Sequence, residues 1–163
     1  MQITNSQEEY IKTIYILSKT EKEIRVTDIA NKLKITKPSV NRAIKNLAEI
    51  DLIQYKTYGE IKITEKGKQQ AQKILKKEDL LKIFLAGVLG IETKKAEKEA
   101  ISMKHAISQE TEEELEKYIN KLLNLNNLDC GYDEKSEKCK NCTKITLRNR
   151  IKEKLDEKGL TAI

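Results

Sequence analysis

Apolar residues recur three and four positions apart along most of the chain, a spacing that predicts amphipathic helices. The pattern predicts a first helix that ends near residue 19, a short second helix that starts at residue 26 or 27, and a third helix over residues 37–50. Further helices are predicted after residue 64. The chain is therefore expected to be mainly α-helical.

Local signals refine this first part of the chain. Ser6 and Glu9 have the spacing of a capping box, in which both side chains accept a backbone N–H at a helix start. Pro38, the only proline, falls in the first turn of the third helix, where its missing N–H is tolerated. Residues 51–64 alternate apolar and polar on either side of Tyr58–Gly59, which predicts a two-stranded hairpin. Three helices followed by a hairpin is the order of a winged helix-turn-helix.

After the hairpin, helical spacing predicts helices over about residues 64–89, 93–107 and 109–125. A polar loop is expected over residues 124–142. A last helix is predicted over residues 143–158, with a glycine after it as a stop signal.

The third helix is predicted to have one apolar and one polar face. The apolar face consists of Val40, Ala43, Ile44, Leu47 and Ala48. The polar face consists of Ser39, Asn41, Arg42, Lys45 and Asn46. Arginine, lysine and asparagine on one helix face suit the base edges and phosphates of a major groove. A merely solvated face is the alternative, but the preceding turn, the proline and the hairpin favour DNA readout.

Composition limits the classes of function that the chain can have. The net charge of +6 is compatible with a nucleic-acid partner. The longest apolar run, Ile83–Ile91, is far shorter than the roughly 20 residues of a membrane span, and the N-terminus is polar, so a soluble, cytoplasmic protein with no membrane partner is expected. One histidine and no Gly-rich phosphate loop leave little for catalysis. A thiol oxidoreductase at Cys139 and Cys142 lacks its usual strand–helix context, so no enzymatic activity is expected.

All three cysteines lie near the end of the chain, as Cys130, Cys139 and Cys142. This spacing predicts a site for a transition metal, either zinc or iron, or for an iron–sulfur cluster, because soft thiolates select these ions. The fourth ligand is open: His105, Asp133, a water or a partner subunit are candidates. Spectator thiols and a redox switch are the alternatives, and the lysines beside Cys139 and Cys142 favour reactive thiolates.

The segments SQEEYIKTIYIL, RVTDIANKLKITKPSVNRAIKNLAEIDLIQY and GEIKITEKGKQQA resemble the iron- and manganese-dependent repressors of the diphtheria toxin repressor/manganese transport regulator (DtxR/MntR) family. The resemblance continues through LLKIFLAGVLGI and AEKEAISMKHAIS, to about residue 108. It implies a homodimer in which each protomer places one recognition helix in a half-site of a palindromic double-stranded operator. The helix face, the hairpin and the resemblance together give as expected DNA contacts Thr36, Lys37, Pro38, Ser39, Asn41, Arg42, Lys45, Lys56 and Tyr58. Lys62 of the hairpin is a further candidate.

With the resemblance, the chain is expected to divide into three parts. A winged helix-turn-helix DNA-binding domain is predicted over residues 1–66, and a helical dimerisation and metal-sensing domain over residues 67–126. A three-cysteine loop and a C-terminal helix complete the chain over residues 127–163.

The resemblance also implies where the family holds its metal. The corresponding positions are Glu9, Lys12, Glu78, Lys82, Ile101, Lys104 and His105. Glu9, Glu78 and His105 have donor atoms for Fe(II) or Mn(II). Lys12, Ile101 and Lys104 have none, since a protonated ammonium offers no lone pair. Glu9 as a cap partner and His105 as an interface residue are the alternatives to ligation. One hypothesis is that Lys12 and Lys104 supply the positive charge that a divalent cation supplies in relatives.

The sequence thus predicts a homodimeric DNA-binding transcriptional regulator, of the repressor type, controlled by metal or iron–sulfur occupancy. The alternative is a winged-helix protein-interaction module with a structural zinc site and no operator. Salt-dependent binding to a palindromic duplex would separate the two, because an adaptor has no reason to prefer DNA with two-fold symmetry.

Overall fold

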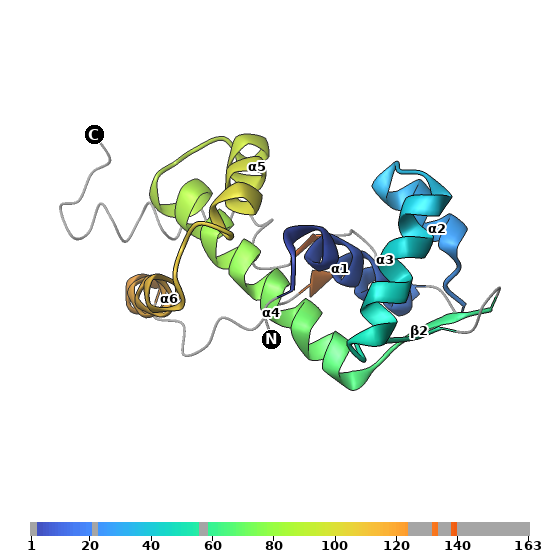
Figure 1. Ribbon diagram of the computed structural model, residues 1–163. Coiled ribbons are helices and arrows are strands. Elements are labelled where there is room, and N and C mark those ends of the chain that lie inside the picture. The colour runs from blue at the N-terminus through green and yellow to red at the C-terminus, as the bar shows by residue number, and fades with distance from the viewer. Residues whose placement is uncertain (1–2, 21–22, 56–58, 124–131, 134–137, 140–163) are drawn as a thin grey trace. The chain divides into compact units, whose positions relative to one another are not determined.

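The computed structural model describes residues 3–20, 23–55, 59–123, 132–133 and 138–139. The chain divides into two compact units, Met1–Ile74 (unit 1) and Leu75–Ile163 (unit 2). Each unit is described by itself below, with the elements labelled as in Figure 1. The expected order of elements, a winged helix-turn-helix followed by helices, is confirmed.

Unit 1 is a small helical domain with a two-stranded hairpin. Its elements are α1 (Asn5–Thr20), α2 (Val26–Leu33), α3 (Lys37–Glu49), β1 (Ile53–Tyr55) and β2 (Ile61–Ile63), followed by the first part of α4 (Glu65–Lys82). The largest fully buried side chains of this unit are Ile11, Ile14, Ile29, Val40, Ile44, Leu47 and Ile61. They come from all three helices and from β2, so one apolar core fixes α3 against its neighbours.

The start of α1 differs from the prediction. The backbone N–H of Gln7 donates to Thr4 Oγ1 at 3.2 Å, and the backbone N–H of Thr4 donates to Gln7 Oε1 at 2.8 Å. The capping box is therefore formed by Thr4 and Gln7, and the prediction of Ser6 and Glu9 is wrong. Both pairs have the required spacing, but α1 begins at Asn5, so Ser6 already lies within the first turn.

A three-residue turn separates α2 from α3. Lys34 ends α2 in the left-handed conformation, with φ of 56°, and the backbone N–H of Ile35 returns to the carbonyl of Ala30 at 3.0 Å. This is a common way for a helix to end, although glycine usually occupies the left-handed position. The turn lets α3 start at once in a new direction, beside α2 in Figure 1.

The hairpin is joined firmly to the start of α4. Ile53 pairs with Ile63 across the antiparallel strands. Thr64 Oγ1 donates to the Leu52 carbonyl at 2.9 Å and accepts the N–H of Gly67 at 3.0 Å, so Thr64 caps α4, which was predicted to start at about residue 64. Gly67 packs so closely here that an added Cβ would lie 2.1 Å from the Leu52 oxygen.

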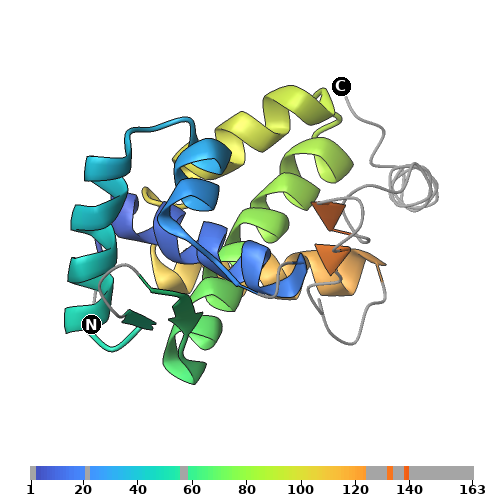
Figure 2. The same ribbon diagram turned by 90° about the vertical axis from the view of Figure 1, so that its right-hand side faces the viewer.

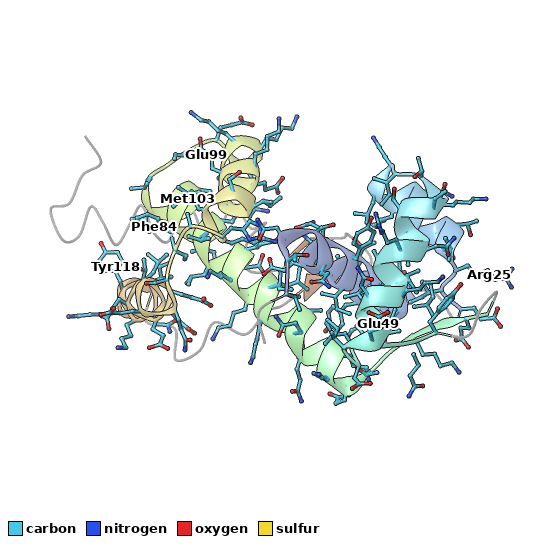
Figure 3. The ribbon with its side chains drawn as sticks, in the orientation of Figure 1. Arg25, Glu49, Phe84, Glu99, Met103 and Tyr118 are labelled. Carbon is cyan, nitrogen blue, oxygen red and sulfur yellow. The ribbon has the colours of Figure 1, made fainter. Side chains whose placement is uncertain are left out.

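Unit 2 contains the rest of α4, the π-helical segment η1 (Ile83–Val88), α5 (Thr93–Met103) and α6 (Gln109–Leu123). The predicted single helix over residues 64–89 is thus regular only to Lys82, because the chain then widens into π-helical turns, as in the bond from Leu89 N–H to the Phe84 carbonyl at 3.1 Å. The buried cluster of this unit is Leu81, Leu85, Ala96 and Ala100, with Phe84 and Met103 packed against it (Figure 3).

The C-terminal part of the chain lies largely outside the described residues, including the predicted helix over residues 143–158. Two short strands, β3 (Tyr132–Asp133) and β4 (Lys138–Cys139), pair antiparallel within the segment predicted as a polar loop. None of the helices in the described ranges has the length and apolar character needed to cross a membrane.

Candidate DNA interface and metal-binding positions

The two faces of α3 are confirmed by burial. Val40, Ala43, Ile44 and Leu47 are buried. Ala48 is half-buried at the edge of that face. The exposed residues are Thr36, Lys37, Pro38, Ser39, Asn41, Arg42, Lys45 and Asn46. Because the apolar face is held by the core of unit 1, the polar face is displayed on a rigid element. The ribbon of α3 is the teal helix at the left-hand side of Figure 2.

The exposed face of α3 is uniformly non-acidic. Between Lys37 and Glu49, which is labelled at the end of α3 in Figure 3, the helix contains no carboxylate. Within the described ranges, Lys37, Arg42 and Lys45 form no ion pair, so their positive charge is not neutralised by a neighbouring residue. A rigid face of this kind attracts a polyanion.

The N-terminus of α3 adds backbone donors to this face. Thr36 precedes the helix with extended backbone, and its hydroxyl lies 2.9 Å from the Ser39 hydroxyl instead of capping the helix. The N–H groups of Lys37 and Ser39 lie in the first turn, where no helical carbonyl is available to them. With the helix dipole pointing its positive end here, this terminus is suited to a phosphate oxygen.

The residues near α3 differ in whether they are described, exposed and paired with an acidic residue. Lys56 and Tyr58 lie outside the described residues. Lys62 on β2 is exposed but forms an ion pair with Glu60, with the Nζ–Oε2 distance at 3.1 Å. Lys34, in the turn before α3, is exposed and was not singled out from the sequence, since a helical wheel does not include turn residues. Its basic character next to the helix entry is the only signal that could have found it.

The positions that the resemblance assigns to the family's metal site contain ion pairs. Lys104 Nζ lies 2.5 Å from Glu78 Oε1, and Lys82 Nζ lies 2.5 Å from Glu97 Oε1, both in unit 2. In unit 1, Lys12 Nζ lies 2.8 Å from Glu9 Oε2.

Two further positions that the resemblance assigns to the metal site lie at the surface. His105, just after α5, and Ile101, within it, are exposed. No group of three or more His, Cys, Asp or Glu residues that could hold a metal occurs in the described part of the chain. Cys130 and Cys142 lie outside the described residues, and Cys139 is described only as part of β4.

A winged helix-turn-helix that presents a basic, rigid recognition helix defines a DNA-binding protein. Comparison with known proteins agrees. The family model described as the N-terminal DNA binding domain of iron dependent repressors matches residues 2–61, and that of their metal binding and dimerisation domain matches residues 64–124. The chain belongs to this iron-dependent repressor family, the metal-dependent transcriptional repressors of the DtxR/MntR type. Its members bind DNA, dimerise through the second domain and are transcriptional regulators, not enzymes.

Individual relatives give the same result. An uncharacterized HTH-type transcriptional regulator of Methanocaldococcus jannaschii is 36% identical over 120 residues, covering 73% of this chain and 96% of the relative. The HTH-type transcriptional regulator MntR of Listeria welshimeri is 30% identical over 105 residues, covering 64% of this chain and 73% of the relative. The structure of the manganese regulator SloR has a TM-score of 0.63 and 30% identity over 72% of this chain, which spans 55% of SloR.

Proposed function

We propose that this protein is a homodimeric transcriptional repressor whose α3 helices read the two half-sites of a palindromic operator. The exposed, non-acidic face of α3 carries this proposal. Arg42 and Asn41 have the groups that pair with guanine and adenine edges, whereas Lys37, Lys45 and the helix N-terminus suit phosphates. The protein-interaction alternative is not favoured by the family match, which is to a DNA-binding domain.

Exposed apolar side chains in unit 2 support self-association. Leu89, Ile101 and Tyr118 are 52%, 41% and 47% exposed, although large apolar residues are normally buried. Tyr118 projects from α6 in Figure 3. The family model that matches this region is that of a dimerisation domain, so a second copy of the chain is the proposed partner.

Control by a metal at the cysteines is a further part of the proposal. The spacing of Cys130, Cys139 and Cys142 supports zinc or iron binding. A single ion is preferred to an iron–sulfur cluster, for which the comparisons give no support; the metal-binding family model itself ends at residue 124, before the first cysteine. Elemental analysis and a visible spectrum of anaerobically purified protein test this part. Stoichiometric zinc or iron that is lost in the Cys139→Ser variant supports it, and metal-free protein rejects it.

The DNA-binding proposal is tested by selecting duplexes from a random library and measuring their affinity for the protein by fluorescence anisotropy. An enriched sequence with two-fold symmetry is expected. Arg42→Ala should lower affinity for that sequence by about 1–3 kcal/mol, and Lys45→Ala should weaken binding to all duplexes and reduce the salt slope by about 1.

The matched control is Lys68→Ala. Lys68 is an exposed lysine of α4 in the same unit, paired with Glu65 at 3.2 Å and outside the α3 face. Affinity should change little in this variant. If no duplex is enriched, or if Arg42→Ala and Lys68→Ala behave alike, the proposal is wrong.

A further inference from the structure

Two reciprocal ion pairs join α4 to α5. Glu78 and Lys82 are one helical turn apart on α4, and they contact Lys104 and Glu97, respectively, with both Nζ–Oε1 distances at 2.5 Å. On α4, and on α5 together with its C-cap residue Lys104, one member is positive and the other negative. The four charges therefore cancel as a set, and each helix is held to the other at two points.

The Lys104 pair is the more buried of the two. The Lys104 side chain is 1% exposed and the Glu78 side chain 14% exposed. Among the described residues, Lys104 is the only charged residue that is buried. Lysine is almost never fully buried unless it is paired. The ion pair with Glu78 therefore stabilises the positive charge of Lys104 in this buried position.

These residues do not fit a divalent cation. A metal site needs lone pairs and an excess of negative charge, whereas an ammonium offers three donors and no lone pair. Lys104 Nζ already occupies the hydrogen-bonding position at Glu78 Oε1, and Lys12 does the same at Glu9 in unit 1. Two of the three family positions with suitable donors are thus engaged by lysines. Glu78 lies within the residues that match a metal-binding domain, and Glu9 lies within those that match the DNA-binding domain.

We infer that the Lys104 ammonium, assisted by Lys82, replaces a divalent cation at the family's metal position and holds α5 against α4 permanently. A tethered ammonium cannot dissociate, so this site cannot report metal availability. The fold of unit 2 and the affinity for DNA are therefore independent of Mn(II) at this position. The DNA part of this inference rests on the proposed function, but the stability part does not.

The first test compares thermal unfolding of the full chain after chelator treatment, with and without added Mn(II). Mn(II) is the probe because hard ions are not preferred by thiolates, so the cysteines do not interfere. A ligand present at 100 times its Kd would raise Tm by about 5–10 °C in a chain of this size. We expect Mn(II) to leave the Tm of the wild type unchanged. The affinity for the selected duplex should also be the same with and without Mn(II).

The second test restores a site. Lys104→Glu places a second carboxylate beside Glu78, so this variant should unfold at a lower temperature in chelator and recover by several degrees in Mn(II). The matched control is Lys76→Glu. Lys76 also pairs with a glutamate, Glu116 of α6 at 2.7 Å, but its side chain is 44% exposed. That control should show no comparable recovery in Mn(II).

The outcomes separate the two proposals. A wild-type Tm or DNA affinity that rises with Mn(II), or a Lys104→Glu variant that responds no more than Lys76→Glu, overturns the inference. If Lys104→Glu fails to fold in both conditions, Lys104→Gln gives the same comparison, because the amide oxygen can ligate and the positive charge is gone. If no duplex is bound in any condition, the proposed function fails while the Tm comparison still decides the inference.

Discussion

The pair of Lys104 and Glu78 should show strong thermodynamic coupling, measured by a double-mutant cycle. The perturbations are Lys104→Met, which keeps an unbranched side chain without the charge, Glu78→Leu, and the two together. At an Nζ–Oε1 distance of 2.5 Å the raw Coulomb attraction is about 7 kcal/mol with an effective dielectric of about 20, and desolvation offsets much of it. The net contribution of the pair is therefore small, but the loss of either partner is severe.

Burial predicts which single substitution is worse. Glu78→Leu removes the Lys104–Glu78 ion pair from an ammonium whose side chain is 1% exposed, whereas Lys104→Met removes the same pair from a carboxylate whose side chain is 14% exposed. Breaking a buried pair costs about 3–5 kcal/mol, and we expect Glu78→Leu near the upper end and Lys104→Met near the lower end. The double variant should lose much less than the sum, because replacing a whole buried pair by apolar residues is often nearly neutral.

The free energy of unfolding of each variant is measured by urea denaturation. The control cycle uses Lys76 and Glu116, whose side chains are 44% and 25% exposed, and its coupling should not exceed about 1 kcal/mol. Additive losses for Lys104→Met and Glu78→Leu, or a coupling no larger than that of the control, would refute the reasoning.

Three other predictions concern unit 1. Gly67→Ala should lower the free energy of unfolding by about 1–3 kcal/mol or more, because the added Cβ would lie 2.1 Å from the Leu52 oxygen. This loss is expected although alanine favours helices, and urea denaturation measures it against the exposed control Gln69→Ala. Thr64→Val should lower it by about 1 kcal/mol through loss of the α4 cap, and unchanged stability would contradict the role of that hydroxyl. Lys37→Ala should reduce the slope of log affinity against log salt by about 0.9 if Lys37 neutralises one phosphate, and an unchanged slope would place Lys37 away from DNA.

Much of unit 1 could be predicted because its local signals agree. The apolar stripe of α3, the proline in its first turn and the alternation in the hairpin all indicate the same fold, and the structure confirms them. The wrong prediction of the capping box arose because two pairs of residues carry the same signal. Thr4 with Gln7 and Ser6 with Glu9 both have capping-box spacing, and only the position of the helix start decides between them.

Tertiary contacts were harder to predict. The hypothesis that Lys12 and Lys104 carry charge in place of a metal came from the family resemblance, which also assigned Glu78 to that site. No local pattern links Lys104 to Glu78, which lies 26 positions away, and the pairing of Lys82 with Glu97 depends on how α5 folds back onto α4. The π-helical turns of η1 have no simple periodic signal, since one extra residue per turn is a small change in an apolar run. The cysteine site and the DNA contacts stay predictions.

The most direct test of the central claim is the ratio of affinities for the selected palindrome and for a scrambled duplex of equal length and composition, at one salt concentration. We predict a ratio of at least about 10³ for the wild type, with two protomers bound per palindrome and the ratio reduced in Arg42→Ala. Equal affinity for both duplexes, or a ratio that Arg42→Ala leaves unchanged, would contradict sequence readout by α3.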